Sequence, residues 1–95
     1  MKSVHVSQIK ANLNNINLID IRESIEFSAL PKLSIAKHIP MDTLVQNPEM
    51  FLEKEKCYYL ICRSGARTSN VTQYLSHLGY NVVNVEGGML EYYNG

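Results

Sequence analysis

The chain has 95 residues, of which 45% are hydrophobic and 19% are charged, as is typical of one soluble globular domain rather than a disordered or membrane chain. Nine lysines and arginines balance nine aspartates and glutamates, so no overall charge would attract nucleic acid or an anionic membrane surface. No apolar run approaches the roughly 18 residues of a membrane helix, and the first residues lack the apolar core of a signal peptide. We therefore expect one domain over residues 1–95 that binds neither nucleic acid nor membrane.

Short apolar runs alternate with segments of helical periodicity along the chain. In chain order, strands are predicted at residues 4–6, 17–21, 35–40, 57–61 and 80–85. Helices are predicted after Ser7, which is placed to cap the first of them, and then at 24–30, 41–45, 48–52, 66–78 and 89–93. Because strands that alternate with helices usually pair in parallel, we expect an α/β domain with a central, mostly parallel sheet of four or five strands and helices on both faces.

The clearest strand and the clearest helix follow each other directly. Residues 57–61 are apolar without alternation, which indicates burial on both faces and a central place in the sheet. In the helix that follows, apolar residues recur at i, i+3, i+4 and i+7 and predict the buried face: Val71, Tyr74, Leu75 and Leu78. Three further tyrosines also fall on patterns that face the core: Tyr58, Tyr59 and Tyr80.

A cysteine stands between this strand and this helix. It opens a short loop with the sequence Cys62-Arg63-Ser64-Gly65-Ala66-Arg67. The thiolate is the reactive form of cysteine, and the helix N-terminus, the converging backbone N–H groups and the two arginines all favour it and an anionic ligand. We interpret Cys62 as a nucleophile, in preference to a buried structural thiol. The hydroxyls of Ser64, Thr68 and Ser69 could donate to the ligand or cap the helix, and capping is favoured for Thr68 and Ser69.

The two cysteines are not expected to form a disulfide. In a strand, Cys57 and Cys62 would lie about 16 Å apart and on opposite faces. Two unpaired thiols fit a reducing compartment, so we expect a cytoplasmic protein in which Cys57 is a small buried residue. His5 and His77 show no ligand spacing, and neither a metal nor a cofactor is expected.

Several stretches in a fixed order together resemble a known family. They are Leu18–Glu23 (LIDIRE), His38–Pro40, Cys62–Arg67 (CRSGAR), Leu78–Tyr80 and Glu86–Gly88 in VEGGMLEYY. This ordered set is similar to the single-domain rhodanese-like sulfurtransferases. The resemblance implies that Cys62 takes a sulfane sulfur from a donor such as thiosulfate, holds it as a persulfide and passes it to a thiol or cyanide acceptor. It also implies that the donor-binding residues are those of the loop: Arg63, Ser64, Gly65, Ala66 and Arg67.

Three other functions are alternatives to a sulfurtransferase. Cysteine phosphatases and arsenate reductases are distant alternatives, because a phosphate ring needs one residue more than the four that separate Cys62 from Arg67. A closer alternative is a carrier module that relays persulfide sulfur to a partner protein. A regulatory domain without activity is disfavoured by the intact cysteine and the two loop arginines.

The chain also departs from the family pattern in two places. No glycine precedes His38 or follows Pro40, and Tyr92 stands where the family often has tryptophan. Asp20, Arg22 and Glu23 are expected to brace loops through hydrogen bonds rather than to react. His38 is expected to be a loop histidine that is hydrogen-bonded to the backbone.

Overall fold

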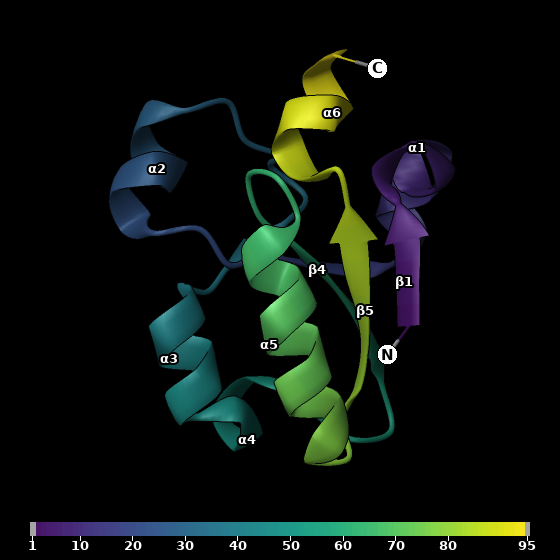
Figure 1. Cartoon of the computed structure of the whole chain (residues 1–95), viewed down its shortest axis with the longest axis vertical. Helices are drawn as coiled ribbons and strands as arrows, with labels where there is room; N and C mark the ends of the chain where they lie inside the picture. Colours follow the sequence, from purple (N-terminus) through teal and green to yellow (C-terminus); the bar gives the residue numbers. More distant parts are fainter. Residues whose placement is uncertain (1, 95) are drawn as a thin grey trace.

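The computed structural model describes residues 2–94, which build one sheet of five parallel strands in the order β1-β5-β4-β2-β3. In Figure 1, β5 lies between β1 and β4. The strands are β1 (Lys2–His5), β2 (Asn17–Asp20), β3 (Lys37–His38), β4 (Cys57–Ile61) and β5 (Asn81–Glu86). The predicted α/β class and parallel sheet are confirmed. The strand with the longest unbroken apolar run, β4, takes the central position, where both of its faces are covered.

Helices cover both faces of this sheet. They are α1 (Val6–Ile9), the 3-10 helix η1 (Lys10–Asn15), α2 (Ser24–Ala29), α3 (Met41–Gln46), α4 (Pro48–Phe51), α5 (Ala66–His77) and α6 (Gly88–Asn94). One core cluster joins the sheet to α3 and α5, which lie side by side in Figure 1, and a second joins the opposite face to α1 and α6. Neighbouring residues of β2 divide between the two clusters, Leu18 to one and Ile19 to the other, because side chains alternate along a strand.

The first helix begins two residues earlier than predicted, at Val6. His5 caps it in place of Ser7, because the His5 ring accepts a hydrogen bond from the Ser7 N–H at 3.2 Å. The Gln8 side chain in turn accepts from the His5 N–H at 2.8 Å and completes a capping box. Val6 and Ile9 are buried by this register, and the chain then tightens into η1.

The buried face of α5 also differs from the prediction. Its buried residues are Thr68, Val71, Thr72 and Leu75. Tyr74 and Leu78 are 46% and 41% exposed, so the prediction was wrong for these two residues. The i, i+3, i+4, i+7 spacing is real, but it starts three residues earlier and includes two threonines. The other tyrosines expected at the core do pack against it: Tyr58, Tyr59 and Tyr80.

The carboxyl ends of the parallel strands meet at one edge of the sheet, and the chain leaves β2, β4 and β5 there into α2, α5 and α6 (Figure 1). No helix within residues 2–94 is long and apolar enough to cross a bilayer. The loops at this edge include the cysteine loop, so the fold places the predicted site where α/β sheets commonly bind ligands.

Candidate functional site

The predicted nucleophile lies at the carboxyl end of the central strand. Cys62 follows the last residue of β4 and is fully buried, at 0% exposed. The Gly65 N–H donates a hydrogen bond to Cys62 Sγ at 3.1 Å. Gly65 has φ +100°, and a Cβ at this position would lie 3.2 Å from the backbone nitrogen of Gly87. A glycine therefore lets the loop turn back far enough to direct an amide at the sulfur.

The loop is fastened by the N-terminus of α6. The Met89 N–H donates to the Cys62 carbonyl and the Leu90 N–H donates to the Arg63 carbonyl, both at 2.9 Å. A Cβ on Gly88 would lie 2.5 Å from each of these two carbonyl oxygens. The second glycine of the Gly87-Gly88 pair therefore allows α6 to approach the loop.

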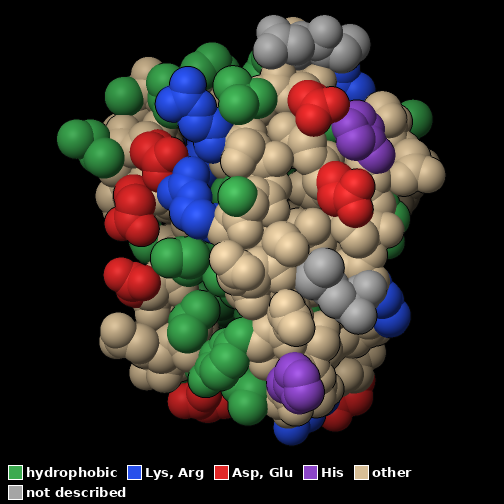
Figure 2. All heavy atoms as spheres, in the orientation of Figure 1, with side chains coloured by type: hydrophobic (Ala, Val, Ile, Leu, Met, Phe, Trp, Pro, Cys, Tyr) green, Lys and Arg blue, Asp and Glu red, His purple; other side chains and the backbone are tan. Residues whose placement is uncertain are grey.

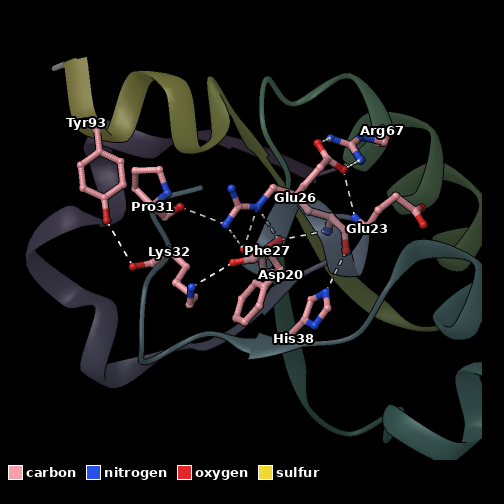
Figure 3. A network of polar contacts seen from close by, with 10 residues as sticks. Asp20, Glu23, Glu26, Phe27, Pro31, Lys32, His38, Arg67 and Tyr93 are labelled. Atoms are coloured by element: carbon pink, nitrogen blue, oxygen red, sulfur yellow. Dashed lines mark hydrogen bonds and ion pairs between the residues drawn. The ribbon is translucent and has the colours of Figure 1, made fainter. Parts of the chain in front are cut away.

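The two loop arginines have different surroundings. Arg67 donates to both carboxylate oxygens of Glu26 on α2, at 2.5 and 2.9 Å (Figure 3). The hydrogen bond from Arg67 lowers the pKa of Glu26 from 4.5 to about 2, and the same bond raises the pKa of Arg67 above its ordinary value. Figure 2 shows basic side chains between acidic and apolar ones on the surface over α2 and the start of α5. Arg67 therefore joins two helices through its guanidinium.

Arg63 is the exposed arginine of the loop. Within residues 2–94, no hydrogen bond or ion pair engages its side chain. Arg63 lines a pocket of about 190 Å³ that opens between the loop, α6 and the segment after α2. Leu90 and Tyr93 supply apolar lining on the α6 side, and Pro31 supplies it on the other side. The pocket thus pairs one uncommitted positive charge with a largely apolar wall.

The hydroxyl residues in and just after the loop differ in their contacts. Ser64 Oγ accepts from the Ala66 N–H at 3.4 Å, which supports the turn. No side chain caps α5. Thr68 instead points inward, with Oγ1 at 3.8 Å from Cys62 Sγ, 2.5 Å from Asn84 Oδ1 and 3.1 Å from the Gly65 carbonyl. The expected capping by Thr68 and Ser69 is therefore wrong.

The Thr68 hydroxyl is thus a neighbour of the sulfur, although the sequence favoured a capping role for it. A signal was present in the sequence, since Thr68 and Thr72 share the helical stripe of Val71 and Leu75. A buried hydroxyl usually has a polar partner inside the fold, although among residues 2–94 the buried Thr72 hydroxyl has none. Asn84 on β5 is the partner of Thr68.

A buried ion pair braces the loop after β2. Arg22 Nη2 lies 2.9 Å from Asp20 Oδ2, and the two side chains are 1% and 0% exposed. Arg22 Nη2 also donates to the Pro31 carbonyl at 3.1 Å, and His38 Nε2 lies 2.8 Å from the Arg22 carbonyl (Figure 3). The His38 ring stacks on Phe27 with ring centres 4.0 Å apart. These contacts match the bracing role that was expected of Asp20, Arg22 and His38.

The remaining cysteine and histidines lie apart from the loop. Cys57 is a free thiol and is half-buried, which makes it more accessible than predicted. His5 pairs with Glu91 on α6 at 2.9 Å. Within residues 2–94, no group of three or more His, Cys, Asp or Glu side chains is arranged to hold a metal ion.

Comparison with known proteins points in the same direction as this geometry. The model of one family, "Rhodanese-like domain", matches residues 5–94. The chain is 39% identical over 93 residues to the Bacillus subtilis protein named "Putative sulfurtransferase YtwF", and the match covers 95% of this chain and 88% of that one. It is 33% identical over 89 residues to a sulfurtransferase of Allochromatium vinosum, which covers 93% of this chain and 81% of the relative. The crystal structure of SSP1007 from Staphylococcus saprophyticus is similar with a TM-score of 0.87 at 34% identity, over 97% of this chain and 93% of that one.

Proposed function

This chain belongs to the family of rhodanese-like domains, and from that premise we propose that it is a sulfurtransferase that carries sulfur as a persulfide on Cys62, with thiosulfate as a donor. The observation that supports this most directly is the Gly65 N–H, which donates to Cys62 Sγ at 3.1 Å. An amide in this position stabilises negative charge on sulfur. The loop thus favours the attacking thiolate.

The proposed reaction has two steps. In the first, the Cys62 thiolate attacks the outer sulfur of thiosulfate, an S–S bond forms to Cys62, and the sulfur–sulfur bond of thiosulfate breaks to release sulfite. In the second, a thiolate or cyanide attacks the outer sulfur of the persulfide, and Cys62 leaves as a thiolate. No net oxidant or reductant is needed, and no metal or cofactor enters either step.

We assign donor binding first to Arg63. Its side chain is exposed and uncommitted beside the pocket, so it can pair with the sulfonate end of thiosulfate. Arg67 contributes mainly through Glu26, which already occupies both ends of its guanidinium. The same pairing counts against a cysteine phosphatase, in which an arginine has to hold the phosphoryl oxygens. Ser64, Gly65 and Ala66 supply backbone to the cradle.

A second candidate is a carrier that passes its sulfur to a partner protein. The observation in its favour is the apolar wall of the pocket, where Leu90 and Tyr93 are 43% and 52% exposed. Exposed apolar side chains beside a reactive loop suit a protein surface better than a small anion. The free thiols Cys57 and Cys62 support a location in a reducing compartment such as the cytoplasm for either function.

One experiment tests the proposal and separates the two candidates. Incubation with thiosulfate is expected to add the mass of one sulfur atom to Cys62 in intact and peptide mass spectra. Cys62→Ser should gain nothing, and Cys57→Ser, the matched control, should load as the unchanged protein does. Rapid thiocyanate formation from thiosulfate and cyanide supports the enzyme, whereas a loaded persulfide that turns over slowly supports the carrier. A sulfur adduct found on Cys57 alone would overturn both.

A further inference from the structure

A chain of polar contacts leads from the sulfur of Cys62 to the surface of the protein. Thr68 Oγ1 lies 3.8 Å from Cys62 Sγ and 2.5 Å from Asn84 Oδ1. Asn84 Nδ2 donates to Ser3 Oγ at 3.3 Å, and Ser3 Oγ donates to the Glu86 carboxylate. The first three residues are buried, whereas the last two are exposed. The path therefore connects a buried sulfur to a surface charge.

The positions of the available protons decide which group donates and which accepts at each of these hydrogen bonds. A carboxylate only accepts hydrogen bonds, so the hydroxyl proton of Ser3 is directed at Glu86. The Ser3 oxygen then accepts from the amide nitrogen of Asn84, which turns the amide oxygen toward Thr68. Thr68 has one hydroxyl proton, and Asn84 Oδ1 takes it, with the Gly65 carbonyl at 3.1 Å as a second acceptor. A lone pair of the Thr68 oxygen is therefore left to face the sulfur.

We propose that Glu86, acting through Ser3, sets the orientation of the Asn84 amide, and that Asn84 is a positioning residue for the hydroxyl of Thr68. In the observed orientation, Thr68 accepts a hydrogen bond from the sulfur and so favours the protonated thiol. A half-turn of the Asn84 amide would let its nitrogen donate to Thr68, whose own proton could then point at a sulfur anion. That half-turn requires the proton of Ser3 to move from Glu86 to Asn84 Oδ1. The surface carboxylate thus opposes the reactive form of the site.

Other charges around these groups stay the same in the test below. His5 is the register partner of Glu86 on β1, and Arg67 lies in the first turn of the helix that follows the cysteine loop. The proposal rests on the proposed function for its relevance, because an anionic sulfur is the form that attacks a donor. Its test, however, uses no sulfur donor.

The test places Glu86→Gln in two backgrounds, the unchanged protein and Ser3→Ala. The readouts are the ultraviolet absorbance of the Cys62 thiolate at neutral pH and the rate of its alkylation by iodoacetamide. For each readout, the value of the matching Cys62→Ser variant, which retains only Cys57, is subtracted. A glutamine amide at position 86 can donate to the Ser3 oxygen, so that the Ser3 proton becomes free to point at Asn84 Oδ1. Glu86→Gln is therefore expected to raise the alkylation rate about two- to tenfold, the effect of one hydrogen bond, with a parallel rise in absorbance.

The Ser3→Ala background distinguishes this path from a direct effect of charge. Both positions lie on the surface, so the variants are expected to fold. If the path operates as proposed, Glu86→Gln has almost no effect once Ser3 is alanine. An equal rise in the two backgrounds would assign the effect to lost surface charge and overturn the proposal, as would no rise in the unchanged protein. If the effect of Glu86→Gln depends on Ser3 but thiosulfate adds no sulfur to Cys62, the proposed function is overturned and this inference stands.

Discussion

Single residues at this site are constrained by backbone atoms that come from distant parts of the chain. Gly88 follows Cys62 by many residues, yet its α-carbon lies against the carbonyls of Cys62 and Arg63. The sequence shows Gly87-Gly88 only as a turn, because a close approach between two segments leaves no local pattern. The identity of the loop itself was easier to predict, since Cys62 and Gly65 lie only three positions apart in the sequence and are in contact in the fold.

The steric role of Gly88 predicts a large effect of one methyl group. Gly88→Ala places a Cβ 2.5 Å from two carbonyl oxygens and has to push α6 away from the loop. We expect the free energy of unfolding in urea to fall by about 2 kcal/mol or more and persulfide loading to be lost with it. Gly79→Ala is the control, because its Cβ would meet only the Lys54 side chain, at 3.4 Å. That variant should cost about 1 kcal/mol, for its positive φ, and load normally.

Substitutions of the two loop arginines are expected to have different effects, one on the KM for thiosulfate and the other on stability. Arg63→Ala should raise the KM for thiosulfate several-fold with little change in stability, since its guanidinium has no partner among residues 2–94. Arg67→Ala should lower the free energy of unfolding by about 1 kcal/mol, because it leaves Glu26 without its partner. Thiosulfate turnover and urea unfolding, measured on both variants, check this. An unchanged KM in Arg63→Ala together with a raised KM in Arg67→Ala would reverse the assignment.

At the scale of elements, the Glu26–Arg67 pair is the contact that joins α2 to α5 near the loop. Glu26 also accepts from the Glu23 N–H at 3.0 Å and so helps to begin α2. One carboxylate therefore serves a helix start and an inter-helix bridge (Figure 3). The bridge could not be predicted, because the two residues lie 41 positions apart and each resembles an ordinary surface charge in the sequence.

This bridge predicts a defined dependence of stability on pH. The pKa of Glu26 is lowered to about 2 in the folded protein from 4.5, so its ionised form favours folding. The contribution is present above about pH 4.5 and is lost as the pH falls toward about 2. We expect Glu26→Gln to cost on the order of 1 kcal/mol at neutral pH and almost nothing near pH 2. Urea unfolding across this range checks the result.

The Arg67→Ala background is the control for this dependence. If the arginine is the cause, Glu26→Gln has no pH-dependent cost once Arg67 is alanine. A cost that persists in that background would place the source in the start of α2, through the Glu23 N–H, and would contradict the bridge as its cause.

At the scale of the whole molecule, the strands were predictable because each is a short apolar run, and β4 was placed at the centre for its burial on both faces. The rotation of α5 was not predictable in the same way. Tyr74 and Leu78 look apolar enough for the core, but hydrogen bonds inside the fold let Thr68 take a buried place instead. Polar burial depends on partners such as Asn84, and these are known only once the strands are assembled.

The attachment of the loop to α6 has a consequence for the direction of its peptide groups. In a trans peptide, the C=O and the N–H of the same unit point in opposite directions. Because α6 binds the carbonyls of Cys62 and Arg63, the N–H groups of Arg63 and Ser64 point away from that helix. The next N–H along the loop, that of Gly65, meets Cys62 Sγ at 3.1 Å. The last helix of the fold thus fixes the orientation of two peptide groups of the loop through its own backbone.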